Sequence, residues 1–137
     1  MLLTYHQKSI ELLGTTPQIL QLNLERIRAF EAKYELAIPP ALREWFSLEN
    51  HSELLQKIAS PHNLIEINHA PKFQEDQNCR PHASEPFFVL IENQAVWFMT
   101  VELSKGENPP VYVRYNEPGE LWTVHANSFS DWLHALC

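Results

Sequence analysis

The stretch YELAIPPALREWF, Tyr34 to Phe46, places two consecutive prolines between two helical patterns. Pro39 and Pro40 each disfavour helical geometry at the residue before them, so the first helix must end by Leu36 or Ala37. Pro40 itself suits the first position of a new helix, where the N–H that proline lacks is not needed. The sequence therefore predicts a sharp corner, which turns two apolar helix faces toward one core.

Apolar residues on both sides of this corner recur at helical spacing. After it, Leu42, Trp45 and Phe46 lie on one face of the second helix. A further short helix is expected within residues 52–60, because Pro61 ends its apolar pattern. The residues that form the apolar stripe of the first helix are Leu20, Leu24, Ile27, Phe30 and Tyr34.

Beyond Pro61 the apolar pattern changes to that of short strands. Short connections between the last four predict antiparallel neighbours, and the polar residues 68–86 predict a loop. The ending SFSDWLHAL, Ser128 to Leu136, predicts a closing helix with Ser128 and Asp131 in a capping box. The expected strands are residues 64–67, 87–92, 96–103, 111–115 and 121–124.

This order of elements predicts an α+β fold. We expect an antiparallel-dominated sheet of about four to five strands, with N-terminal helices and a C-terminal helix packed on it. With 137 residues, of which 45% are hydrophobic, the chain can bury one core, so a single domain spanning residues 1–137 is expected.

The net charge is −7 at pH 7 and is unevenly distributed. Residues 66–120 contain nine acidic and four basic side chains, a net of −5, which leaves −2 for the rest of the chain. This charge argues against direct nucleic-acid binding and suits a basic protein partner. No apolar run reaches the roughly 18 residues of a membrane span and no secretory signal is visible, so a cytoplasmic protein without a membrane partner is expected.

A zinc site is one alternative that the residue types allow, because histidines and one cysteine gather in a polar segment. Only Cys79 and His82 have a spacing typical of ligands, and the two cysteines of the chain are too few for a disulfide framework. A solvated loop explains the segment more simply, so no metal is expected. The four residues concerned are His62, His69, Cys79 and His82.

Two further sets have residue types that enzymes use. Ser128, Asp131 and His134 have the types of a hydrolytic triad, but they follow one another along one short helix, where capping explains the first two. Glu117 and Glu120 could act as paired carboxylates, although they flank a Pro-Gly turn of the kind that carries surface charge. The three glycines lie far apart, so no phosphate-binding loop is present. We therefore expect a protein that is not an enzyme and has no cofactor.

A binding surface is favoured by the alternation of strand 96–103, which puts Phe98 and Glu102 on the face opposite the apolar one. If Val111, Val113 and Tyr115 face the core, Tyr112 and Arg114 point outward beside Phe98. Aromatic residues and arginine are enriched at interface hot spots, although an ordinary solvated face or one covered by loop 68–86 would show the same pattern. The predicted partner-binding residues are Phe98, Glu102, Tyr112, Arg114, Glu117 and Glu120.

Two stretches of this chain resemble the SUKH superfamily, known through the yeast cell-wall-synthesis regulator and the bacterial Syd protein. IRAFEAKYELAIPPALREWFSLEN, residues 27–50, is similar to the family's helix, Pro corner and aromatic-bearing second helix. PPVYVRYNEPGELWTVHANSFSDWL, residues 109–133, resembles its Pro-Val-Tyr strand, Trp-containing strand and Ser-Phe helix start. Asn50-His51 departs from the Asn-Gly that the family often has after the second helix.

The resemblance implies a non-enzymatic α+β domain that binds another protein, present as a monomer or weak dimer. Many bacterial relatives look like immunity proteins, which neutralise a cognate toxin such as a nuclease by covering it. An acidic chain is compatible with a basic toxin, because complementary charge speeds association. A regulatory or scaffolding module without a toxin partner remains the alternative.

Overall fold

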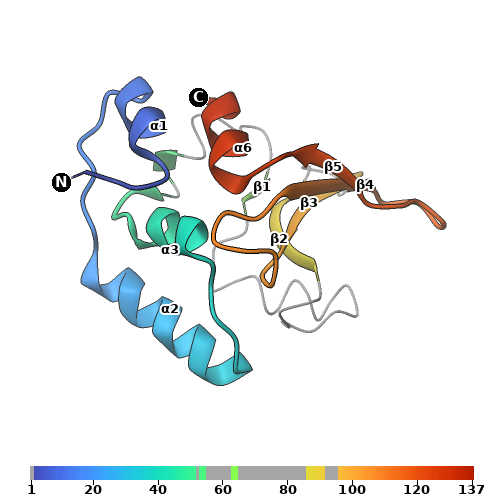
Figure 1. The fold of residues 1–137 in the computed structure, drawn as a ribbon, viewed down its shortest axis with the longest axis horizontal. Helices are drawn as coiled ribbons and strands as arrows, with labels where there is room; N and C mark the ends of the chain where they lie inside the picture. The colour runs from blue at the N-terminus through green and yellow to red at the C-terminus, as the bar shows by residue number, and fades with distance from the viewer. Residues whose placement is uncertain (1, 52, 55–62, 65–85, 92–95) are drawn as a thin grey trace.

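In the computed structural model of the chain, residues 2–51, 53–54, 63–64, 86–91 and 96–137 are described (Figure 1). Five described strands form one antiparallel sheet in the order β1-β2-β3-β4-β5, and the helices lie beside it. The predicted α+β class is confirmed. The elements are α1 (Gln7–Leu12), α2 (Gln21–Tyr34), α3 (Pro40–Ser47), β1 (Asn63–Leu64), β2 (Pro86–Ile91), β3 (Trp97–Glu102), β4 (Val111–Tyr115), β5 (Thr123–Ala126) and α6 (Phe129–Leu136).

The proline corner joins α2 to α3 as its sequence predicts. Glu35 ends α2 in the left-handed conformation, with φ of 52°, and Pro40 is the first residue of α3. The amide of Ala41 in the first turn of α3 donates to the carbonyl of Glu107, at 2.9 Å. Since such first-turn amides have no partner inside their own helix, the loop between β3 and β4 completes the start of α3.

The core lies between the sheet and the helices. In α3, Leu42 and Trp45 are fully buried, as the helical spacing predicts. The rings of Phe30 in α2 and Phe87 in β2 meet edge to face, with centroids 5.9 Å apart. In α6, the indole N–H of Trp132 points at the sulfur of Met99 in β3, at 3.2 Å. Helices α2 and α6 thus pack on the same sheet face, because Phe87 pairs with Val101, two residues from Met99.

The strand predictions agree with the structure to different degrees. β4 has the predicted bounds, β2 and β3 differ from theirs by one residue at each end, and β5 begins two residues later than predicted. β1 includes only the first residue of predicted strand 64–67, since residues 65–67 lie outside the described residues. Predicted loop 68–86 also lies outside them, except for its last residue. Most of predicted helix 52–60 lies outside them as well.

The capping serine of α6 is confirmed. The side-chain oxygen of Ser128 accepts a hydrogen bond from the amide of Asp131, at 3.1 Å. Asn108, in the loop after β3, adds two hydrogen bonds to Ser130: its amide nitrogen donates to the hydroxyl and its amide oxygen accepts from the backbone N–H. The loop between β3 and β4 therefore fixes the starts of both α3 and α6.

Helix α1 has no counterpart among the sequence predictions. The side chain of His6, at its N-cap position, makes no capping hydrogen bond, and a carboxylate from α3 binds the backbone just before the helix. Glu44 accepts hydrogen bonds from the backbone amides of Thr4, Tyr5 and His6, at 2.8 to 2.9 Å. A charged acceptor beside the first turn also suits the positive end of the helix dipole. Glu44 thereby holds the N-terminal segment against α3.

His6 is fully buried in the core between Trp45 and Phe129, whose rings meet it edge to face. Its Nε2 lies 2.7 Å from the carbonyl oxygen of Ala41, which makes Nε2 the donor, while Nδ1 is buried without a partner among the described residues. Burial lowers the pKa of His6 below its ordinary value, and this outweighs the Ala41 carbonyl and the Glu44 carboxylate, which raise it.

Stability is expected to fall as the pH drops below the ordinary histidine value of about 6.5. The unfolded chain then binds a proton that the folded chain excludes, so protonation favours unfolding until the lowered folded-state pKa of His6 is reached. Urea unfolding of the wild type and of His6→Gln at pH 7.5 and pH 5.5 checks this. The wild type should lose more stability than the variant, by at most about 1.4 kcal/mol per pH unit. Equal losses would contradict a neutral buried His6.

Candidate interaction surface

The hairpin of β4 and β5 extends away from the helices (Figure 1). Its turn is closed by the amide of Glu120, which donates to the carbonyl of Glu117 at 3.3 Å, and by Gly119, whose φ of 83° suits glycine. Where the hairpin leaves the sheet, the amide of Asn116 donates to the carbonyl of Val96 at 2.7 Å. The hairpin is therefore anchored at β3 and free of helices at its tip.

On one face of this hairpin a cation lies over an aromatic ring. The guanidinium carbon of Arg114 is 4.6 Å from the ring centroid of Trp122, a distance typical of cation–π contacts. Among the described residues, the Nε of Arg114 is buried without a hydrogen-bond partner. The contact keeps the guanidinium over the indole, so that a pre-ordered cation lies near the end of β4.

The tip of the hairpin is acidic. Glu117 and Glu120 are exposed, and neither belongs to an ion pair between described residues. Those ion pairs join Glu31 to Arg43 and Glu102 to Lys105. Arg114 lies three residues before Glu117, at the end of β4, so both signs of charge occur near the turn of this hairpin. The arrangement can contact a partner with both signs of charge, and among the described residues Glu117 and Glu120 belong to no group of three His, Cys, Asp or Glu side chains that could hold a metal.

The prediction that Phe98 points outward is wrong. Phe98 is 0% exposed and belongs to the core, although it does pair with Arg114 across β3 and β4 as the alternation implies. Thr100, next on the same face, is also buried. The sheet is thus shielded on both faces at these positions, since Met99 and Val101 on the other face are buried too. Phe98 therefore cannot contact a partner from the surface.

The other predicted contacts are not all brought together. Tyr112 is half-buried and pairs with Thr100, so it lies on the same face as Arg114. Glu102 is on that face too, but four residues along β3 from the position opposite Arg114, a separation of roughly 13 Å. Its carboxylate faces Lys105, with the nearest nitrogen 3.9 Å away. Glu102 therefore lies apart from the acidic tip.

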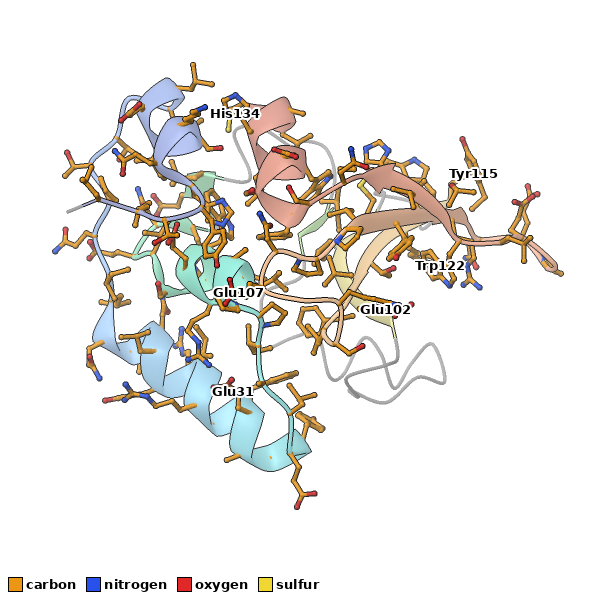
Figure 2. All side chains as sticks on the ribbon, viewed as in Figure 1. Glu31, Glu102, Glu107, Tyr115, Trp122 and His134 are labelled. Carbon is orange, nitrogen blue, oxygen red and sulfur yellow. The ribbon has the colours of Figure 1, made fainter. Side chains whose placement is uncertain are left out.

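Sequence alternation missed the exposed apolar residues of the hairpin. Tyr115 was expected on the core face and is 55% exposed, and Leu121 is 78% exposed. Figure 2 shows Tyr115 and Trp122 on opposite sides of the hairpin. In the sequence, Tyr115 and Leu121 are notable only as residue types that suit strands. What exposes them is the length of the hairpin beyond the helices, which no local pattern reports.

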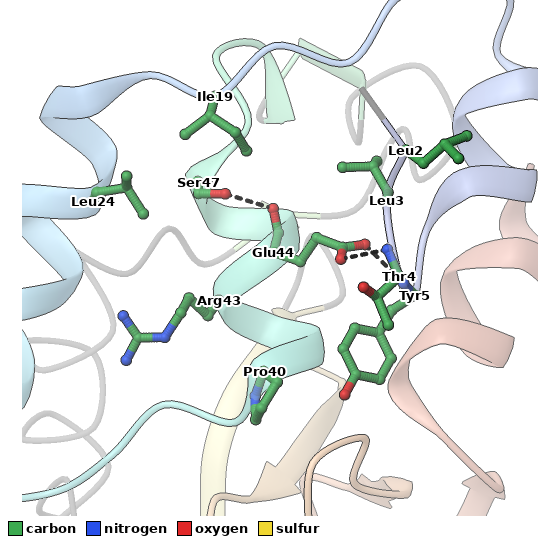
Figure 3. A pocket seen from close by; sticks show the side chains of 10 residues that line it. All are labelled: Leu2, Leu3, Thr4, Tyr5, Ile19, Leu24, Pro40, Arg43, Glu44 and Ser47. Atoms are coloured by element: carbon green, nitrogen blue, oxygen red, sulfur yellow. Dashed lines mark hydrogen bonds between the residues drawn. The ribbon is translucent and has the colours of Figure 1, made fainter.

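A shallow groove of about 410 Å³ lies between the N-terminal segment, α2 and α3 (Figure 3). Its lining is mostly apolar, and both charged side chains in it already have partners: Glu44 accepts the three N-terminal amides and Arg43 pairs with Glu31. The groove therefore offers a new ligand little beyond apolar contact. We do not place the functional site there.

The alternatives with catalytic or metal-binding residues gain no support. Ser128 caps α6 and His134 is exposed at the other end of that helix, so the triad types do not converge. In the described part of the chain, no three His, Cys, Asp or Glu side chains gather as a metal site would require. The predicted zinc ligands all lie outside the described residues: His62, His69, Cys79 and His82.

The fold and this surface define an α+β domain whose accessible feature is a charged and apolar hairpin. Residues 21–135 match the model of the SMI1 / KNR4 family (SUKH-1), and the chain belongs to that family. No curated protein and no solved structure matches the chain. The match begins at α2, so α1 and the segment before it lie outside it. No helix of the described residues is long and apolar enough to cross a lipid bilayer.

Proposed function

We propose that this protein is an immunity protein, a non-enzymatic domain that binds a cognate bacterial toxin and blocks its action. The observation that carries the proposal is the family match over residues 21–135, since bacterial SUKH-like domains resemble immunity proteins. The fold is also consistent with a protein that acts by binding another protein at its surface. Trp45, Phe98 and Trp132 are buried in the core, and within the described part of the chain no three His, Cys, Asp or Glu side chains gather as a metal site would require.

Charge supports a basic toxin, such as a nuclease, as the partner. The chain carries a net charge of −7, and the hairpin tip presents Glu117 and Glu120 to solvent. Complementary charge raises the association rate, which matters for a protein that must capture a toxin before the toxin acts. The acidic charge equally disfavours direct binding to nucleic acid.

Co-expression tests the proposal. The gene next to that of this protein is expressed alone and together with it in a sensitive bacterial host. An immunity protein restores growth that the neighbouring product arrests, and the two proteins co-purify in a fixed ratio. A neighbouring product that is harmless alone, or that arrests growth in spite of this protein, would instead favour a regulatory or scaffolding module.

Tyr112→Ala and Arg114→Ala are each expected to weaken binding to the co-purified partner by about 2 kcal/mol or more. Arginine and tyrosine at the centre of an interface lose both apolar area and hydrogen bonds on truncation, and Arg114 also loses its stacking on Trp122. Isothermal titration calorimetry measures the change. Arg28→Ala, at an exposed position of α2, is the matched control and should bind as the wild type does.

Thermal unfolding of the same variants shows whether the fold is retained, which is necessary because Tyr112 and Arg114 are both partly buried. Wild-type affinity in both folded variants would remove this face of the hairpin from the interface.

A further inference from the structure

Exposed apolar side chains concentrate at the hairpin. Within the described residues, the other large apolar side chains that are exposed lie on the N-terminal segment, α1 and α2: Leu2, Leu12 and Leu22. Isolated exposed residues of this kind are ordinary, but a cluster on one projecting element is typical of an interaction site. The exposed apolar residues of the hairpin and of the start of β3 are Val96, Tyr115, Leu121 and Val124.

Two aromatic side chains of this region are paired across β3 and β4, and an exposed leucine lies where the chain returns toward β5. Trp97 pairs with Tyr115, and Leu121 follows the turn, two residues before β5 begins. We call Trp97, Tyr115 and Leu121 the shelf. Trp97 and Tyr115 lie on the same sheet face as Met99, which α6 covers, because side chains two residues apart share a face. Trp97 is half-buried and Leu121 is exposed, so the exposure of the shelf residues increases from Trp97 to Leu121.

The shelf remains accessible because α6 follows the far end of β5. Helix α6 begins at Phe129, next to the C-terminal end of β5, whereas the shelf lies at the turn end of the hairpin (Figure 1). Tyr115 and Leu121 are 55% and 78% exposed, in contrast to Met99, which α6 contacts and which is buried. The same sheet face is therefore covered at one end and open at the other.

The charge beside the shelf indicates what can lie on it. Glu117 and Glu120 are in the turn that joins Tyr115 to Leu121, and the chain contains no lysine or arginine from Tyr115 to its last residue. An apolar side chain flanked by lysine or arginine can pack on the shelf while its basic neighbours pair with the acidic rim, Glu117 and Glu120. A second copy of this chain would bring two acidic rims together, which like-charge repulsion disfavours.

We propose that the shelf receives an apolar side chain from a basic protein, with lysine or arginine beside it reaching Glu117 and Glu120. This places part of the interface on the face of the hairpin opposite Arg114 and Trp122, so that the partner contacts both sides. The inference rests on the proposed function in that it takes the partner to be a protein. It does not require that partner to be toxic.

Site-specific photo-cross-linking in the source cell tests the shelf. The photoreactive amino acid p-benzoylphenylalanine replaces Leu121 in one variant and Leu12, 63% exposed on α1, in a matched control. The expected result is a cross-link at position 121 that is absent at position 12. Mass spectrometry should identify the product as a different protein with an isoelectric point above about 9. The absence of a cross-link specific to position 121 would overturn the proposal, as would one to a second copy or to an acidic protein.

The cross-linked protein is then purified and titrated with the wild type, Leu121→Asp and Leu12→Asp. Leu121→Asp should bind at least about tenfold more weakly, because it puts a charge into the shelf, whereas Leu12→Asp should bind as the wild type does. Affinity should also fall as salt is raised. Equal affinities of the three proteins would overturn the shelf.

Expression of the gene for the identified partner, without this protein, separates the two proposals. Growth arrest that this protein relieves supports both. A harmless basic partner that requires Leu121 leaves the shelf in place and removes toxin immunity. An arresting partner that binds Leu121→Asp as tightly as the wild type leaves immunity in place and removes the shelf.

Discussion

Replacing Phe98 by alanine is expected to lower the free energy of unfolding by about 3–5 kcal/mol. Phe98 is 0% exposed in the middle of the sheet, where truncation of the ring removes apolar contacts and leaves a cavity that the packed surroundings fill only partly. Urea unfolding followed by tryptophan fluorescence measures the change. A loss of this size is a large fraction of the stability of an ordinary domain, so we expect the variant to be partly unfolded at 37 °C.

Leu121→Ala is the control for this measurement. Leu121 is 78% exposed, and such surface truncations usually change stability by no more than about 0.5 kcal/mol. Had Phe98 been a surface contact, the two variants would have similar stabilities. A small effect of Phe98→Ala on unfolding would therefore show that Phe98 is not a core residue. Phe98 would then again be a candidate for the interface.

Removing the Glu44 carboxylate is expected to cost about 3 kcal/mol and to release the N-terminal segment. In Glu44→Ala, the amides of Thr4, Tyr5 and His6 lose a charged acceptor together, and hydrogen bonds to charged groups contribute more than neutral ones. Glu44→Gln keeps an acceptor without the charge, so its loss should be intermediate. Equilibrium unfolding gives the free energies.

Amide hydrogen exchange locates the effect of this change. The amides of residues 4–6 should exchange faster in Glu44→Ala, while those of β3 should change only as far as global stability does. Glu25→Ala, which removes an exposed carboxylate on α2, serves as the control and should leave both groups unchanged. Equal protection of residues 4–6 in the Glu44→Ala and Glu25→Ala proteins would contradict the role given to Glu44.

Features set by neighbouring residues were predicted well. The corner at Pro39 and Pro40, the bounds of β4 and the cap at Ser128 all follow from what proline, alternating valines and a serine hydroxyl do to the backbone next to them. These effects act within a few residues and do not depend on the rest of the fold. The family resemblance rested on the same segments, and the match over residues 21–135 confirms it.

Features that need a distant partner were not predicted. The segment that leads into α1 is held by Glu44, about forty positions along the chain, and no pattern in the first twelve residues indicates this contact. β5 begins two residues later than expected because Leu121 and Trp122 belong to the turn end of the hairpin, although their residue types favour strands.

The sequence by itself determined the α+β class, the proline corner and which side chains of each strand share a face, because backbone sterics and strand alternation are local. Only the tertiary structure decided which of those faces are covered. Phe98 was expected at the surface and is buried, whereas Tyr115 was expected on the core face and is exposed. The reason is that burial depends on what packs against a strand from elsewhere in the chain. The helices end short of the hairpin tip, and that difference in length leaves Tyr115 and Leu121 available to a partner.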